Sequence, residues 1–211
     1  KAAGGKVWKR ATSGVRTFFA TPQLRGVMFL NLVQAAAGSI VIVSTVNYVR
    51  DRLGGSASDV AWVLAASGAG TLLTALVLPR ILDRVSDRRV MLTGAVTLVV
   101  ASAAAVVMAG VSARNWAALI VIWVVMGIGM ALIATPIGRV IRSSVPRVEL
   151  PGAFAAQFSL SHLTWLITYP IAGWLGVSLG FPITWAVLAA LALVGAVAAW
   201  ALWPGRSIAK S

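Results

Sequence analysis

Four hydrogen-bonding side chains recur at helical spacing in the stretch QFSLSHLTWLITYP, from position 157 to position 170. On a helical wheel Gln157, Ser161, Thr164 and Thr168 lie within about 60° of one another, because residues three and four apart share a face. Their amide and hydroxyl groups both donate and accept hydrogen bonds. The stripe is suited to bind a polar ligand or to bond a neighbouring helix, and we expect it to line a substrate cavity.

A second stripe on the same segment combines aromatic rings with the single histidine of the chain. Phe158, His162, Trp165 and Tyr169 share the helical spacing and lie beside the polar stripe. Imidazole exchanges a proton near neutral pH, and ionisable groups at membrane depth usually face a cavity or a partner. The pattern favours contact of His162, Trp165 and Tyr169 with a substrate. A hydrogen bond between helices and ordinary core packing are the alternatives.

A smaller polar group lies in the first apolar stretch of the chain. Asn31, Gln34 and Thr45 lie broadly on one side of a helix there. An amide in an apolar environment needs hydrogen-bond partners. These residues are equally suited to bind a substrate or to bond neighbouring helices, and all three are candidate cavity residues.

The composition excludes several other kinds of site. There is no cysteine, so disulfides and thiolate chemistry are absent, and one histidine with five carboxylates argues against a metal centre built by the protein. No nucleophile is paired with a base, so we expect neither an enzyme nor a cofactor. No carboxylate lies inside the apolar stretches, which leaves His162 as the intramembrane group that could carry a proton.

The overall composition indicates that helices in a membrane position these residues. Hydrophobic residues make up 59% of the 211 positions and charged residues 11%, with a mean hydropathy of +0.91; soluble domains carry about 25% charged residues. Only helices and closed barrels cross lipid, and the apolar stretches are too long for barrel strands. We predict an all-α membrane protein whose six transmembrane helices span about residues 26–49, 60–78, 90–111, 116–137, 152–177 and 181–203.

A basic segment, residues 1–25, precedes the first predicted helix. Its apolar residues recur at helical spacing, with most basic residues on other faces: Trp8, Ala11, Val15, Phe18 and Phe19. The pattern predicts a short amphipathic helix on the cytoplasmic membrane surface; a disordered basic arm is the alternative. Thr21 and Pro22 are typical of an N-cap followed by proline at the first helical position. Residues 204–211 are predicted to form a cytoplasmic tail.

The basic residues predict the orientation of the helices. Fifteen of the 18 Lys and Arg residues lie in the N-terminal segment, the second-to-third loop, the fourth-to-fifth connection and the tail. The positive-inside rule then places both termini in the cytoplasm of a multi-pass protein in the plasma membrane. This distribution accounts for most of the net charge of +13, so no nucleic-acid partner is expected.

Small residues and prolines single out particular helices. The segments AASGAG (65–70) and GIGMALIATP (127–136) contain residues that let helix backbones approach closely. Pro136 and Pro170 each interrupt the backbone hydrogen bonds of an apolar helix. Each proline is a candidate hinge, and a static kink is the alternative.

The loop PRILDRVSDRRVM (79–91) resembles the Asp-Arg…Arg-Arg loop of the major facilitator superfamily, which joins the second and third helices of each six-helix half. Asp83 and Arg84 match its Asp-Arg, and Arg88 and Arg89 match its basic pair. Pro79, Ser86 and the extra residue Asp87 depart from it. The resemblance implies that these four charged residues hold the cytoplasmic side closed; a role limited to topology and lipid headgroups is the alternative.

Taken over its length, the chain resembles helices seven to twelve of that superfamily. The resemblance implies a substrate site between this half and an N-terminal six-helix half, with the third and sixth helices outside the cavity. It further implies a secondary active transporter working by alternating access, typically a bacterial proton-coupled antiporter that exports small molecules or drugs. Direction and substrate class rest on the resemblance alone. A non-transporting membrane subunit and a half-transporter acting as a homodimer are the alternatives.

Overall fold

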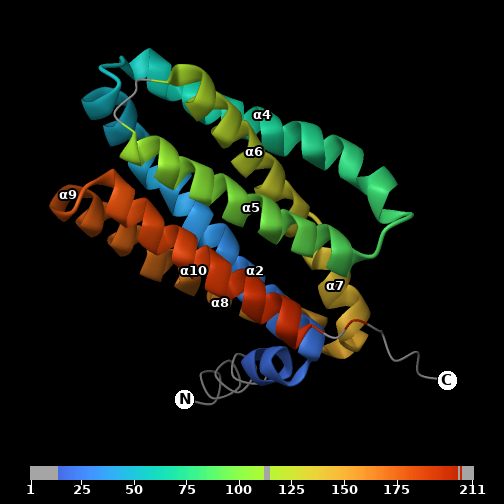
Figure 1. Cartoon of the computed structure of the whole chain (residues 1–211). Coiled ribbons are helices and arrows are strands. Elements are labelled where there is room, and N and C mark those ends of the chain that lie inside the picture. The colour runs from blue at the N-terminus through green and yellow to red at the C-terminus, as the bar shows by residue number, and fades with distance from the viewer. Residues whose placement is uncertain (1–13, 112–114, 204, 206–211) are drawn as a thin grey trace.

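The computed structural model describes residues 14–111, 115–203 and 205, and most of this part of the chain is helical (Figure 1). The helices are α2 (Pro22–Ser39), α3 (Thr45–Asn47), α4 (Ala57–Leu82), α5 (Asp87–Gly110), α6 (Trp116–Ala134), α7 (Ile137–Ser144), α8 (Leu150–Pro170), α9 (Gly176–Ser178) and α10 (Phe181–Leu202). Three wider π-helical segments continue these helices without a break: η1 (Ile40–Ser44), η2 (Tyr48–Arg52) and η4 (Ile171–Leu175). One 3-10 turn, η3 (Arg147–Glu149), precedes α8.

Within the described residues, the helical runs that are long and apolar enough to cross a membrane number five: Pro22–Arg52, Ala57–Leu82, Asp87–Gly110, Trp116–Ser144 and Phe181–Leu202. Five of the six predicted spans overlap these runs, while their crossing of a membrane at the predicted bounds stays a prediction. The predicted span 152–177 is helical from Leu150 through Ser178, but it does not belong to this set. Its polar side chains, including Gln157 and His162, lower its hydropathy. A sixth membrane crossing therefore stays a prediction.

The helices form one bundle in which the first predicted span is central. Helix α2 contacts α10, α8 and α5, whereas α4 packs mainly on α6, and α6 in turn on α5. Helix α10 lies along α5, so these two helices share one side of the bundle (Figure 1). The consequence for burial is large. In the apolar segment of Pro22–Arg52, 67% of the residues are buried inside the bundle, whereas in that of α4 the share is 22%.

Glycines bring α4 and α6 into direct backbone contact, as the small-residue segments predict. A Cβ atom added to Gly127 would overlap the carbonyl oxygen of Ser67, and one added to Gly70 would overlap that of Val124. Thr71 uses the short distance to donate a hydrogen bond of 3.1 Å to the carbonyl oxygen of Gly127. Backbone carbonyls cannot rotate away as flexible side chains can, so this crossing tolerates little added volume.

Both candidate hinges coincide with changes in helix geometry. Helix α6 ends at Ala134, and a turn at Pro136 leads into α7. Pro170 is the last residue of α8 and is followed directly by η4. The helix is interrupted by a turn at Pro136, whereas at Pro170 it changes from α to π geometry without a break. Motion at either proline stays a prediction. The π-helical segments η1 and η2 were not predicted, and η1 contacts η4.

Residues 14–20 form a short helix at the end of the bundle where α7 lies (Figure 1). Phe18 is fully buried, and Thr17 donates a 3.0 Å hydrogen bond to Glu149. Phe18 on the apolar side of this helix is therefore packed inside the protein, whereas the sequence predicts that this side lies on the membrane surface. Residues 1–13 of the predicted lead-in and residues 204 and 206–211 of the predicted tail lie outside the described residues.

The sequence predicts the first residue of α2 correctly, but the expected capping hydrogen bond from the Thr21 side chain is not formed. The helix begins at Pro22 with Thr21 at the N-cap position. The Thr21 hydroxyl does not cap α2; it donates a 2.8 Å hydrogen bond back to the carbonyl oxygen of Thr17. Proline needs no N–H acceptor at the first position, which reduces the demand for a cap.

Candidate functional site

The centre of the candidate site is a pair of amides that joins α2 to α8. Nδ2 of Asn31 donates to Oε1 of Gln157 over 3.1 Å, and Nε2 of Gln157 donates to Oδ1 of Asn31 over 2.9 Å. Asn31 is buried and Gln157 is half-buried. Two reciprocal bonds fix both the distance and the rotation of the two helices at this level.

Hydroxyl groups continue the same interface towards η1 and η4. Oγ of Ser39 lies 2.8 Å from both Oγ1 of Thr168 and the carbonyl oxygen of Ala35, and its one hydrogen is donated to either acceptor. Thr168 in turn donates to that carbonyl over 3.2 Å. Thr164 donates over 2.6 Å to the carbonyl oxygen of Ser161 in its own helix, and its Oγ1 also lies 3.4 Å from the carbonyl oxygen of Asn31. Gln157, Thr164 and Thr168 therefore face α2. The remaining member of the predicted stripe, Ser161, bonds within its own helix to the carbonyl oxygen of Phe158.

The candidates in the first span have three different environments. Asn31 belongs to the amide pair, while Gln34 is half-exposed and its amide has no hydrogen-bond partner among the described residues. Thr45 is fully buried. It accepts a 2.8 Å hydrogen bond from Nε1 of Trp123 and donates to the carbonyl oxygen of Val41. Its hydroxyl is thus occupied in the core between the first span and α6.

His162 is exposed on α8 and is not buried in a helix contact. Its Nδ1 lies 2.7 Å from the carbonyl oxygen of Phe158, and its ring stacks on the Phe158 ring with centroids 4.0 Å apart. A carbonyl only accepts, so Nδ1 is assigned the hydrogen and the neutral ring keeps its lone pair on Nε2. The backbone and Phe158 thereby orient His162 with one nitrogen left to accept a hydrogen bond or a proton.

Trp165 and Tyr169 continue this face along α8. Their rings meet edge to face with centroids 5.1 Å apart. A Cβ atom on Gly38 would overlap the indole of Trp165, so the glycine allows this ring to lie close against α2 beside Met130. Tyr169 keeps an exposed fraction of 38%. Helix α8 therefore carries two ring pairs, Phe158–His162 and Trp165–Tyr169, of which Trp165 is half-buried against α2.

Replacing Asn31 or Gln157 by alanine should lower the free energy of unfolding, because the two side chains bond each other. Asn31→Ala or Gln157→Ala leaves the other amide unpaired, which costs about 1–3 kcal/mol when the group is buried. The double variant removes both groups, so its free energy of unfolding should fall by less than the sum, with a coupling of about 0.5–2 kcal/mol. SDS-induced unfolding followed by circular dichroism measures all three. Additive losses would contradict the pair.

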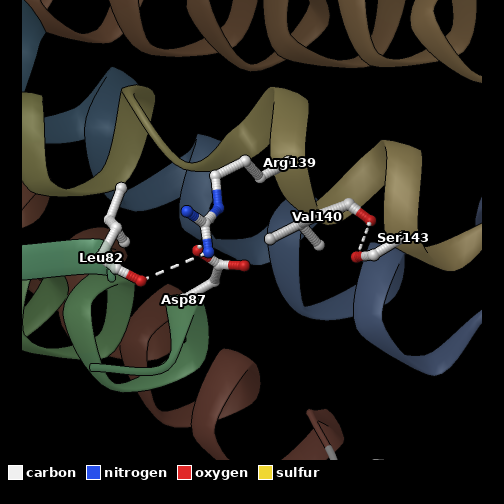
Figure 2. A network of polar contacts seen from close by, with 5 residues as sticks. All are labelled: Leu82, Asp87, Arg139, Val140 and Ser143. Atoms are coloured by element: carbon white, nitrogen blue, oxygen red, sulfur yellow. Dashed lines mark hydrogen bonds and ion pairs between the residues drawn. The ribbon is translucent and has the colours of Figure 1, made fainter. Parts of the chain in front are cut away.

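A second cluster lies at the end of the bundle that carries the predicted gating loop. Arg139 of α7 forms an ion pair with Asp87 at the start of α5, with Nε 3.2 Å from Oδ1 (Figure 2). Its Nη2 also lies 3.4 Å from the carbonyl oxygen of Leu82, at the end of α4 (Figure 2). One guanidinium therefore connects the ends of three helices.

The four residues predicted from the loop motif differ in their contacts. Arg88 donates from Nε to the carbonyl oxygen of Trp203 over 3.1 Å and from Nη2 to that of Trp200 over 3.3 Å. It thus covers free carbonyls at the end of α10. Asp83, Arg84 and Arg89 are exposed, and their side chains have no hydrogen-bond partner within the part of the chain described here. Among the described residues, the carboxylate of this loop that forms an ion pair is that of Asp87.

Sequence reasoning missed two sets of contact residues. Ser39 and Trp123 were not candidates, although each bonds a candidate threonine. The Asp87–Arg139 pair was also missed, because Asp87 was treated as an extra residue of the loop. An acidic residue in the first turn of α5 and a basic residue beyond Pro136 were visible signals. Nothing in their spacing indicated that these two turns meet.

Comparison with known families decides the class of the bundle. The family model described as Major Facilitator Superfamily matches residues 27–210. The chain belongs to the Major Facilitator Superfamily. No curated protein matches the chain.

Membership of the Major Facilitator Superfamily indicates the general function of this helical bundle. Proteins of this family are membrane transporters rather than typical enzymes. The chain is therefore assigned to membrane transport, as a multi-pass protein whose helices contact the lipid bilayer. For a Major Facilitator Superfamily protein, the α2–α8 interface and the aromatic face of α8 are candidate parts of a transport pathway.

Proposed function

We propose that the chain is the C-terminal half of a secondary active transporter that exports small molecules in exchange for protons across a bacterial plasma membrane. The observation that carries the proposal is the exposed face of α8. There, His162 and the rings of Phe158 and Tyr169 are exposed on a helix whose other side is bonded to α2. A helix that is held by hydrogen bonds on one side and exposes polar and aromatic side chains on the other is suited to form the wall of a transport pathway.

The free face of α8 indicates the class of substrate. Phe158 is 65% exposed and Leu166 69% exposed, so most of this surface is apolar. His162 adds a hydrogen-bond acceptor at Nε2 in its neutral form, and Gln34 on α2 has an unpaired amide among the described residues. These groups would suit a flat, largely apolar molecule that carries a hydrogen-bond donor. We propose that the N-terminal half packs across this face.

Alternating access requires parts of the bundle that separate as units. Arg139 ties α7 to α4 and α5 at one end, and Pro136 separates α7 from α6. We propose that closing and opening at the cytoplasmic side make and break the Asp87–Arg139 ion pair, with Pro136 and Pro170 as hinges. The pair is half-exposed, with Arg139 50% accessible, so its rupture exposes charges to water at little cost.

Transport in proteoliposomes tests the proposal. With an imposed pH gradient, vesicles that contain the chain together with its N-terminal half should accumulate an apolar fluorescent amine, and a protonophore should abolish this accumulation. Vesicles without protein provide the baseline. Movement that is unaffected by the protonophore would contradict proton coupling, and no movement of any small apolar amine would contradict the substrate class.

The orientation is tested by chemical labelling. Ser86→Cys introduces the only thiol of the chain, at the N-cap position of α5. In sealed right-side-out vesicles this thiol should react with a membrane-permeant maleimide and resist an impermeant one, because the loop is expected in the cytoplasm. Ser56→Cys, at the N-cap of α4 and the opposite end, is the matched control and should react with both. The reverse pattern would contradict the orientation.

A further inference from the structure

A basic cavity of about 610 Å³ opens at the end of the bundle where α5 begins and α10 ends. Three arginines and several hydroxyl groups line it, among them Arg84, Arg88, Arg89, Ser86 and Ser143. Asp87 is the single acidic side chain in the lining, and Arg139 pairs with it. The described lining therefore carries a net positive charge beside donors that suit the oxygens of a phosphate group.

The arginines of this cavity retain donors for a ligand. Arg88 donates from Nε to the carbonyl oxygen of Trp203 and from Nη2 to that of Trp200. Three of its five N–H groups therefore remain able to donate to a ligand. Arg84 and Arg89 are exposed and make no side-chain hydrogen bond to any described residue. The bonds to α10 hold Arg88 in place, so an anion in the cavity meets at least one pre-oriented guanidinium.

An apolar groove of about 330 Å³ lies next to this cavity, between α5 and α10. Its walls are entirely hydrophobic and include Val96, Val99 and Val100 of α5 and Leu193, Val197 and Trp200 of α10. Both helices belong to the set that is long and apolar enough to cross a membrane. A groove of this kind on the side of a membrane helix is suited to hold a hydrocarbon chain.

The cavity and the groove follow one another along the same two helices. Arg88 and the groove residues Leu92, Val96 and Val99 recur every three or four positions, so they share one face of α5. Trp203 of the cavity and Trp200 of the groove are likewise three positions apart near the end of α10, and both carbonyls bond Arg88. A ligand in the cavity therefore lies about one helical turn, ~6 Å, from the start of the groove.

We propose that this composite surface binds one anionic phospholipid, with its phosphate among Arg84, Arg88 and Arg89 and an acyl chain in the α5–α10 groove. A zwitterionic lipid fills the groove but matches the positive cavity less well, and a soluble phosphate matches the cavity but leaves the groove empty. The site lies apart from the α2–α8 interface and does not depend on the identity of the transported molecule.

Lipid retention tests the cavity. The purified full chain is placed in nanodiscs of equal amounts of phosphatidylglycerol and phosphatidylcholine, extracted in mild detergent, and the retained lipids are counted by native mass spectrometry. Phosphatidylglycerol should be enriched. Arg84→Gln with Arg89→Gln should weaken this enrichment by about fivefold per arginine. The matched control Arg80→Gln with Arg147→Gln removes two exposed charges outside the cavity and should leave it unchanged.

The groove has its own test. Ala196→Trp fills the groove and should lower phosphatidylglycerol retention, whereas Ala190→Trp, exposed on α10 outside the groove, should not. Equal retention of both lipids, or equal losses in the cavity and control variants, would overturn the proposal. So would displacement of the lipid by millimolar inorganic phosphate together with no effect of Ala196→Trp, since that result indicates a soluble anion.

Discussion

Proton-driven transport should fall by about ten- to a hundredfold when His162 is replaced by alanine. In the proposed mechanism the imidazole bonds the substrate or proton through Nε2, and a hydrogen bond to a charged group is worth about 1.5–3 kcal/mol, which corresponds to this range. The free energy of unfolding should change by less than about 0.5 kcal/mol, because His162 is exposed and bonds only its own helix. Uptake in proteoliposomes and SDS unfolding measure the two effects separately.

Two further variants distinguish the roles of this side chain. His162→Gln keeps a hydrogen-bonding group but cannot titrate, so it should bind substrate while losing the response to a pH gradient. Ser178→Ala is the control, because Ser178 also is exposed and bonds only within its helical run, to the carbonyl oxygen of Trp174. Normal proton-driven uptake by His162→Ala would reject the face of α8 as part of the pathway.

Alanine at Gly127 should lower the free energy of unfolding by about 1–3 kcal/mol, the usual cost of overpacking. The added Cβ overlaps the backbone carbonyl of Ser67, which can move only if α4 and α6 separate. The adjacent hydrogen bond from Thr71 to the Gly127 carbonyl would lengthen as well. Thermal unfolding of the purified protein, followed by tryptophan fluorescence, gives the change in midpoint.

The matched control for Gly127 lies on the opposing helix. At Gly68 of α4, no heavy atom lies within 4 Å of the place that a Cβ atom would occupy, so Gly68→Ala adds a methyl group to open space. Alanine favours a helix over glycine by about 1 kcal/mol, so this variant should not be destabilised. Opposite effects of the same substitution would identify backbone contact as the cause. Equal effects at both positions would contradict the close crossing.

Helical periodicity predicted which residues of the fifth span share a face, but not what that face meets. Gln157, Thr164 and Thr168 do lie together, and they face α2. A polar stripe in an apolar helix must be satisfied by a partner helix or by a cavity, and both produce the same spacing. The partner depends on packing between residues more than a hundred positions apart, which a wheel does not contain.

The Asp87–Arg139 pair shows a second limit of sequence reasoning. The loop motif drew attention to Asp83, yet the ion pair forms at Asp87. Motif alignment treated Asp87 as an insertion, whereas its position in the first turn of α5 places it opposite Arg139. The π-helical segments were also invisible, because η1 reads IVIVS and a uniformly apolar run has no periodicity to reveal an added residue.

The segment η1 sets the rotational phase of the first span at the end of the bundle where α10 begins. A π-turn holds one residue more than an α-turn, and one residue corresponds to a rotation of about 100°. Beyond η1, this phase brings Tyr48 against Phe181 and Trp185, with ring centroids 5.2 and 4.8 Å away. Deleting one residue from η1 would rotate Tyr48 out of this cluster while leaving the Asn31–Gln157 pair in register. The rotation of side chains about the axis of the first span can thus differ between its two ends, because η1 lies between them.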